Sequence, residues 1–114
     1  MAIDHLAPGE VTDIRLPGDQ LQEAISTAVF KSPELEVMRL VLRADQRIPE
    51  HTAPGDMTVQ GLDGSAEVAV DGRPRRVPAG HLLRLARGMR YEVRAAEDCV
   101  LLVTISMPPE PGTA

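Results

Sequence analysis

The sequence predicts an all-β protein, a single antiparallel barrel or sandwich with little helix. Roughly nine or ten short runs favour strands, and turn residues separate them at intervals of about 8–12 positions. The 114 residues suit one domain with its own core. Because hydrophobic residues make up 43% of the chain and aromatic residues only 2%, that core is expected to be aliphatic.

Three parts are expected along the chain. Residues 1–10 are predicted to form a flexible arm, residues 11–106 the single barrel domain, and the Pro-rich residues 107–114 a disordered tail. No internal repeat period appears, so the prediction is one domain.

The first half of the domain alternates short strands with turns that contain Pro or Gly. Residues 11–16 alternate well enough to predict a first strand. Asp19 is a candidate cap for a short helical turn, because its carboxylate can accept from exposed first-turn amides. Further extended segments are predicted over residues 26–31, 34–43 and 47–51.

Residues 51–72 are predicted to be the central hairpin of the fold. Asp63-Gly64 separates two β-like runs, and a tight two-residue turn needs the positive φ that Gly adopts cheaply. His51 comes just before the first run, where the mouth of a barrel would place it over the interior. Pro49 restricts Ile48 to extended geometry, which fixes how the chain presents His51. After the hairpin, strands are predicted over residues 73–78, 81–86, 90–95 and 99–106.

Charge and composition exclude several classes of partner. A net charge of −5 disfavours nucleic acid and anionic membranes, and the scarcity of aromatics removes the stacking platforms that bind single strands. The arginines between Arg73 and Arg94 are spaced as the solvent face of successive strands. No apolar run is long enough to span a bilayer, so no membrane partner is expected.

The single cysteine points to a reducing compartment. Cys99 lies in the apolar run CVLLVTI, where a buried, inert thiol is expected. The N-terminus has neither the basic nor the apolar region of a signal peptide. The expected location is cytoplasmic.

Two motifs carry a resemblance to a known family over residues 35–105. The first runs Asp45, five residues, His51-Thr52-Ala53, three residues, Met57, six residues, Gly64. It resembles the first motif of the cupin superfamily, in which a Gly, His-x-His, a Glu and a Gly have this spacing. This chain keeps the first histidine and the closing glycine.

The second motif also keeps the family spacing while several of its side chains differ. Gly80, five residues, Ala86-Arg87-Gly88, two residues, Tyr91, three residues and Ala95 match the spacing of the cupin Gly, Pro-x-Gly, His and Asn. The resemblance implies a small single-domain bacterial cupin, an RmlC-like jelly roll or double-stranded β-helix of uncharacterised function.

The same resemblance implies that the family's metal site is largely lost. That site uses two or three histidines and a carboxylate, a set suited to a first-row divalent ion. Only His51 remains at those four positions, so no cofactor is expected. The alternative is a divalent-metal-dependent enzyme, oxygenase- or isomerase-like, that holds Mn, Fe, Ni or Zn with His51 and substitute ligands. The candidates for those ligands are Gln60, Tyr91 and Asp56, although strand alternation places Gln60 and Asp56 on the face opposite Met57.

The positions that face inward in the family then define an apolar pocket. Its expected lining is His51, Met57, Val59, Tyr91, Val93, Met38 and Leu40. The predicted function is binding of a small molecule, with His51 and Tyr91 orienting the ligand. Acid/base catalysis by His51 without a metal and a purely structural role for both residues stay open. The resemblance also implies a homodimer, to which residues 11–16 and 26–31 would contribute strands. His81 is expected to face solvent or an interface.

Overall fold

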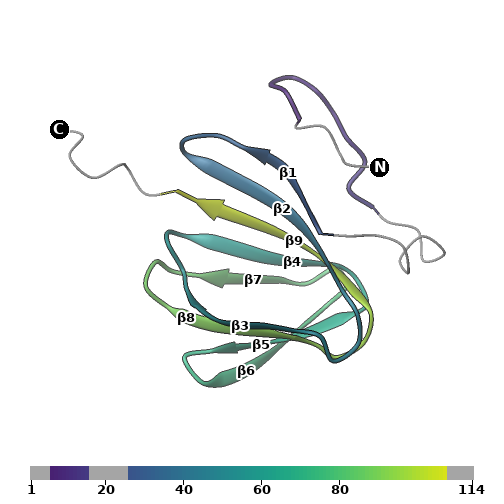
Figure 1. Cartoon of the computed structure of the whole chain (residues 1–114), viewed down its shortest axis with the longest axis vertical. Helices are drawn as coiled ribbons and strands as arrows, with labels where there is room; N and C mark the ends of the chain where they lie inside the picture. Colours follow the sequence, from purple (N-terminus) through teal and green to yellow (C-terminus); the bar gives the residue numbers. More distant parts are fainter. Residues whose placement is uncertain (1–5, 16–25, 108–114) are drawn as a thin grey trace.

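The structure is a computed structural model that describes residues 6–15 and 26–107. Within those residues it contains nine strands and no helix (Figure 1). The strands are β1 (Thr27–Lys31), β2 (Leu35–Leu42), β3 (Arg47–Thr52), β4 (Met57–Asp63), β5 (Ser65–Val70), β6 (Arg73–Pro78), β7 (Leu82–Leu85), β8 (Arg90–Ala95) and β9 (Cys99–Ser106). No helix in the described part of the chain is long and apolar enough to cross a membrane.

The strands form two antiparallel sheets that face each other. One sheet has the order β1-β2-β9-β4-β7, and the other has the order β3-β8-β5-β6 (Figure 1). Every strand pair is antiparallel, and most neighbours within a sheet are distant in the sequence. The predicted all-β antiparallel architecture is therefore confirmed, and its connections are those of a jelly roll.

The core lies between the two sheets and is aliphatic, as composition predicted. Its completely enclosed side chains include Leu85, Leu101, Val59 and Val68, which come from four different strands. Cys99 belongs to the same cluster and is a free, buried thiol, which confirms the prediction for this residue. Burial and the nearby carboxylates raise its pKa to about 11.

The strand predicted over residues 11–16 is wrong where the structure describes it. Residues 11–15 form no strand, and Val11 is 96% exposed. Asp13 instead accepts hydrogen bonds from the backbone amide and the guanidinium of Arg15, and these bonds hold its pKa at about 2. Local alternation alone does not make a strand here, because no strand of the described residues pairs with this segment. Residue 16 and the turn predicted after Asp19 lie outside the described residues.

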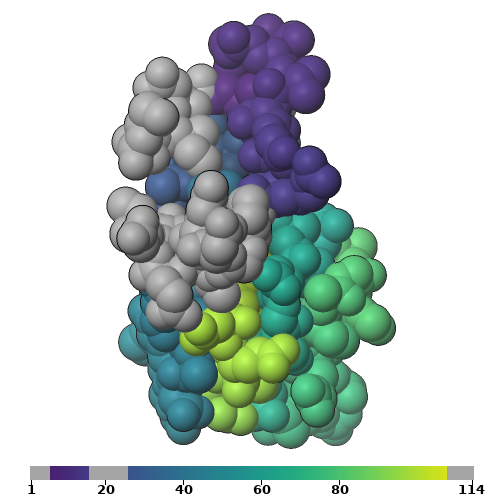
Figure 2. Space-filling view, turned by 90° about the vertical axis from the view of Figure 1, so that its right-hand side faces the viewer, coloured from purple at the N-terminus to yellow at the C-terminus, as the bar shows by residue number. Residues whose placement is uncertain are grey.

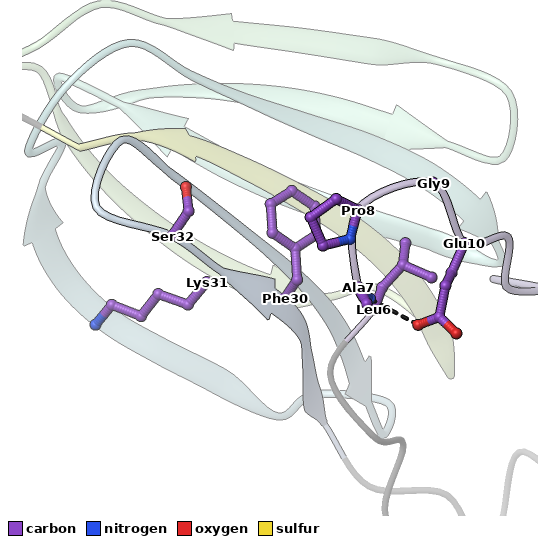
Figure 3. A pocket seen from close by; sticks show the side chains of 8 residues that line it. All are labelled: Leu6, Ala7, Pro8, Gly9, Glu10, Phe30, Lys31 and Ser32. Carbon is purple, nitrogen blue, oxygen red and sulfur yellow. Dashed lines mark hydrogen bonds between the residues drawn. The ribbon is translucent and has the colours of Figure 1, made fainter.

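The segment before β1 folds back onto the edge of the larger sheet. The Leu6 amide donates to the Val29 carbonyl oxygen at 2.9 Å, and the Ala7 amide donates to the Glu10 carboxylate at 2.8 Å. Leu6, Ala7, Glu10 and Phe30 are among the residues that line a concavity of about 360 Å³ (Figure 3). Residues 6–15 lie at the β1 end of the molecule, away from β6 (Figures 1 and 2).

The hairpin predicted at Asp63-Gly64 is also wrong. The strands on either side, β4 and β5, belong to different sheets and do not pair. Gly64 is a corner at which the chain passes from one sheet to the other, with φ at +67°. A Cβ at this position would lie 2.1 Å from the Asp98 carbonyl oxygen, so only glycine fits between the crossing chains.

The true hairpin is eight residues further on. Val70 pairs with Arg73 across the two-residue turn Asp71-Gly72, which joins β5 to β6. Asp71 and Gly72 have φ of 49° and 83°, the positive pair that a type I′ turn requires. Both Asp-Gly dipeptides thus adopt positive φ at the glycine, but only the second one reverses the chain within a sheet.

Candidate functional site

The residues predicted to line a pocket surround one cavity. Its volume is about 250 Å³, and it lies between the sheets against β2, β3, β4, β8 and β9. All seven predicted residues line it: Met38, Leu40, His51, Met57, Val59, Tyr91 and Val93. Met57, Val59 and Val93 are buried and His51 is exposed at the mouth, whereas the other three residues are partly buried.

A bulge in β3 decides which way His51 points. Ile48 pairs with Val93 and His51 pairs with Tyr91, so Pro49 and Glu50 together lie opposite one residue of β8. Strict alternation from inward-facing Ile48 would aim residue 50 into the barrel. The extra residue reverses this phase, which is the usual effect of a bulge on the side chains that follow it.

The residues of the bulge suit this geometry. Pro49 has no amide hydrogen to leave unpaired, which is why proline is tolerated at bulges. Glu50 is turned outward, where its carboxylate lies 3.9 Å from the Arg90 guanidinium. The charged neighbour of His51 is thereby kept out of the cavity.

Two polar rings stand at the mouth of the cavity. The His51 and Tyr91 rings stack with centroids 6.1 Å apart and planes inclined by 30°. His51 Nδ1 donates to the Pro49 carbonyl oxygen, so the neutral imidazole presents Nε2 as a hydrogen-bond acceptor. Burial raises the pKa of Tyr91, which keeps its phenol protonated near neutral pH. The mouth therefore offers one acceptor and one hydroxyl.

The glycine positions of the two motifs share one backbone conformation. Gly64, Gly80 and Gly88 have φ between 67° and 90°, and Asp45, at the opening position of the first motif, has φ of 67°. Aspartate is among the few non-glycine residues that tolerate this region. The backbone frame of both motifs is thus retained even where a side chain has changed.

No protein-family model matches this sequence, and no curated protein is significantly similar to it in sequence. Solved structures are similar in fold. A conserved protein of unknown function from Streptococcus pyogenes has a TM-score of 0.76 and 24% identity, and the match covers 96% of this chain and 97% of that one. A cupin superfamily protein from Desulfitobacterium hafniense has a TM-score of 0.74 and 16% identity, over 95% and 100% of the two chains. This chain is a small cupin-fold protein.

A third similar structure is an RmlC-like cupin protein from Desulfovibrio desulfuricans. Its TM-score is 0.66 at 24% identity, and the match covers 96% of this chain and all of that one, 100%. These similarities extend over nearly the whole of both chains, so the cupin fold accounts for the described barrel.

The side chains at the four motif positions do not fit a divalent metal ion. At the four motif positions stand the His51 imidazole, the methyl group of Ala53, the Met57 thioether and the Tyr91 phenol. Ala53 is 1% exposed and packs in the core, so no donor replaces the second histidine. A thioether and a protonated phenol are poor ligands for hard or borderline cations.

The substitute ligands do not gather at His51 either. Gln60 is exposed and is absent from the cavity lining, whereas its neighbours Val59 and Gly61 are buried. The Asp56 carboxylate lies 3.4 Å from the Arg84 guanidinium. In the described part of the chain, no group of three or more His, Cys, Asp or Glu side chains is placed to hold a metal.

Four lining residues were not predicted from the sequence. Leu101, Val103 and Ile105 form the floor from β9, and Ile48 contributes from β3. The first three alternate along a strand whose position was predicted correctly, so their shared face was a usable signal. That this face belongs to the cavity follows from the position of β9 between β2 and β4.

Proposed function

We propose that this cupin-fold protein binds a small, mainly apolar molecule in the cavity below His51 and Tyr91, without a metal ion. The observation that supports this is the composition of the lining: apart from the two rings at the mouth, every lining residue is aliphatic or methionine. Binding sites for small molecules are commonly apolar cavities with a few placed polar groups.

The two rings define the polar end of the ligand. His51 Nε2 accepts a hydrogen bond, and the Tyr91 hydroxyl donates or accepts one. A ligand with one hydroxyl or amide at the end of an apolar body satisfies both. The volume of about 250 Å³ restricts it to a compact molecule, such as a small phenol or a short branched alcohol.

The test compares two histidine variants. His51→Ala removes the acceptor and is expected to weaken binding of the best phenol or alcohol by about tenfold, which is typical of one lost hydrogen bond. His81→Ala is the matched control, because His81 is also exposed and its Nδ1 also contacts a carbonyl oxygen two residues earlier, that of Ala79, outside the cavity. The increase in melting temperature on addition of the ligand measures binding by each variant. Equal loss in the two variants, or no stabilisation of the natural protein by any such compound, contradicts the proposal.

The alternative is metal-dependent chemistry at an atypical site around His51. One observation favours a metal site: Nε2 of the neutral imidazole carries no proton, and an unprotonated ring nitrogen is what histidine uses to bind metals. Elemental analysis of the purified protein separates the two functions. Stoichiometric Mn, Fe, Ni or Zn that disappears in His51→Ala would replace the metal-free proposal.

We also propose that the protein is a homodimer that acts in the cytoplasm. β1 is one of the two edge strands of the larger sheet, and an edge strand needs a partner or a cover. Since residues 11–15 form no strand, β1 is the described edge that would pair. Light scattering at micromolar concentration tests the dimer, and a monomer would contradict it. The reduced, buried Cys99 supports the cytoplasmic location.

A further inference from the structure

A further concave site lies beside β6, which is the edge of the four-stranded sheet opposite to β3 and His51. It is a groove of about 450 Å³ bordered by β6 and β7, which are the edge strands of the two sheets. Arg73, Arg75 and Arg84 line it. Val70, Leu83 and Met89 provide an apolar surface between them. The groove shares no lining residue with the cavity below His51.

Two of these arginines occupy inward-facing positions. On β6, Arg73 and Arg75 share the face of Val77, which is 2% exposed and belongs to the core. Across the ladder, Arg73 pairs with Val70 and Arg75 pairs with Val68. Positions that would continue the core thus carry charged side chains where the barrel opens between its two edge strands.

The positive charge of this segment is not balanced by acidic residues within the segment itself. Residues 73–91 contain six arginines and no acidic residue, in a chain whose net charge is −5. Among the described residues, neither Arg73 nor Arg75 lies within ion-pair distance of a carboxylate. Arg84 has one such contact, with Asp56 at 3.4 Å.

The one acidic residue that lines the groove is engaged elsewhere. The Asp71 carboxylate accepts a hydrogen bond from the Arg90 amide at 3.0 Å, which anchors the β5–β6 turn to β8. Since none of the ion pairs of the described residues involves Arg73 or Arg75, their guanidinium groups keep donors for a ligand. Arginine binds carboxylate and phosphate groups with paired, charge-assisted hydrogen bonds.

We propose that this groove binds a small organic anion, whose carboxylate or phosphate head is held by the three arginines while its apolar body covers the three apolar side chains. This site is independent of the cavity proposed to bind the uncharged ligand.

The experiment measures binding of hexanoate, hexyl phosphate, inorganic phosphate and uncharged hexanol by titration calorimetry or NMR at low salt. At least one of the two hexyl anions is expected to bind about tenfold more tightly than hexanol, and salt is expected to weaken that binding. Comparison of hexanoate with hexyl phosphate identifies the head group. Comparison with inorganic phosphate measures the contribution of the apolar body.

Variants on the two faces of β6 provide the control. Arg73→Gln combined with Arg75→Gln is expected to weaken binding of the anion by about tenfold or more. Arg76→Gln, on the opposite face of the same strand, is expected to leave binding within about twofold. Arg84→Gln, on β7, tests the site from the other sheet and is also expected to weaken binding. His51→Ala is expected to leave anion binding unchanged, so failure of either proposed site is recognised separately.

Three outcomes would overturn the proposal. The first is absence of saturable binding of both hexyl anions to the natural protein. The second is an equal effect of Arg76→Gln and the double variant. The third is self-association of the double variant with unaltered anion binding, which would mean that the arginines only protect the strand edges from pairing.

Discussion

The cavity below His51 and the groove at β6 and β7 both lie where the two sheets face each other, but the cavity is lined by apolar side chains and the groove carries arginines. Both are lined mainly by inward-facing residues, whereas Arg84 of the groove lies on the outer face of β7. Four of the five strands that bound the cavity lie in the middle of the sheets, the fifth is the edge strand β3, and the cavity is apolar up to its mouth. The groove is bounded by edge strands and carries three arginines.

This difference follows from what covers each position. An inward side chain on β9 is enclosed by neighbouring strands and by the facing sheet, so a charge there would lose its hydration without compensation. An inward side chain on β6 reaches the opening of the barrel, where a guanidinium group stays hydrated while its aliphatic stem covers apolar surface. The same alternation therefore produces a core position on one strand and a charged lining on another.

The largest effect is expected from a substitution in the floor of the cavity, which tests whether the cavity and the groove are independent. Leu101 is completely buried, so Leu101→Ala is expected to lower the free energy of unfolding by about 3 kcal/mol. Leu82→Ala is the control, because Leu82 is 65% exposed on β7 and its loss is expected to cost less than about 0.5 kcal/mol.

Denaturant unfolding measures both leucine variants, and titration with the hexyl anion measures whether the groove is affected. If the two regions are independent, folded Leu101→Ala binds the anion as the natural protein does. A parallel loss of anion binding would show that the floor of the cavity also supports the groove.

An intermediate effect is expected from alkaline pH, through the core next to the cavity. Because the pKa of Cys99 rises from 9.0 to about 11 in the folded protein, the unfolded chain releases this proton first. The contribution of Cys99 to the free energy of unfolding is fully present below pH about 9. It is lost as the pH rises to about 11, which lowers the free energy of unfolding by up to about 2 kcal/mol. The raised pKa of Tyr91 acts in the same direction.

Denaturant midpoints across this pH range test the prediction. The free energy of unfolding of Cys99→Ala is expected to fall less at alkaline pH than that of the natural protein because, of the two groups, only Tyr91 still contributes. Identical declines in both proteins would exclude Cys99 as a source of the pH dependence.

The smallest effect is expected in the groove. Asp56→Asn removes the carboxylate that lies 3.4 Å from Arg84, and both side chains are well exposed. The change in stability is expected to stay within about 0.5 kcal/mol, as for other surface ion pairs. Anion binding is expected to strengthen by about twofold to threefold, because Arg84 no longer has a competing partner. Calorimetric titration checks this, and weaker binding would remove Arg84 from the site.

The sequence predicted much of the barrel because alternation along each strand is a local property. The strands over residues 73–78, 90–95 and 99–106 have the predicted limits. The inward faces of β4 and β8 were also predicted, with Met57, Val59 and Val93 buried. The assignment of these residues to one cavity came from the spacing of two motifs, in which each glycine position adopts positive φ whether it holds Gly or Asp45.

Pairing between strands could not be predicted, because it depends on segments that are distant in the sequence. Asp63-Gly64 and Asp71-Gly72 both favour turns, yet only the second closes a hairpin. The first is a corner that Asp98 and Cys99 approach from another part of the chain. The strand predicted over residues 11–16 failed in its described part for the same reason, since a strand needs a partner.

By itself, the sequence determined an aliphatic, all-β barrel, and it predicted that one histidine stands at the positions that match a family metal motif. The tertiary structure decided how that histidine is presented, because a two-residue bulge opposite β8 turns His51 inward and Glu50 outward. It also decided that arginines with a solvent-face spacing line a groove, because β6 and β7 are the edges at which the two sheets remain open. Local alternation determines which side chains share a face of a strand, but only the packing of the two sheets determines whether that face lies in the core, in a cavity, in a groove or in solvent.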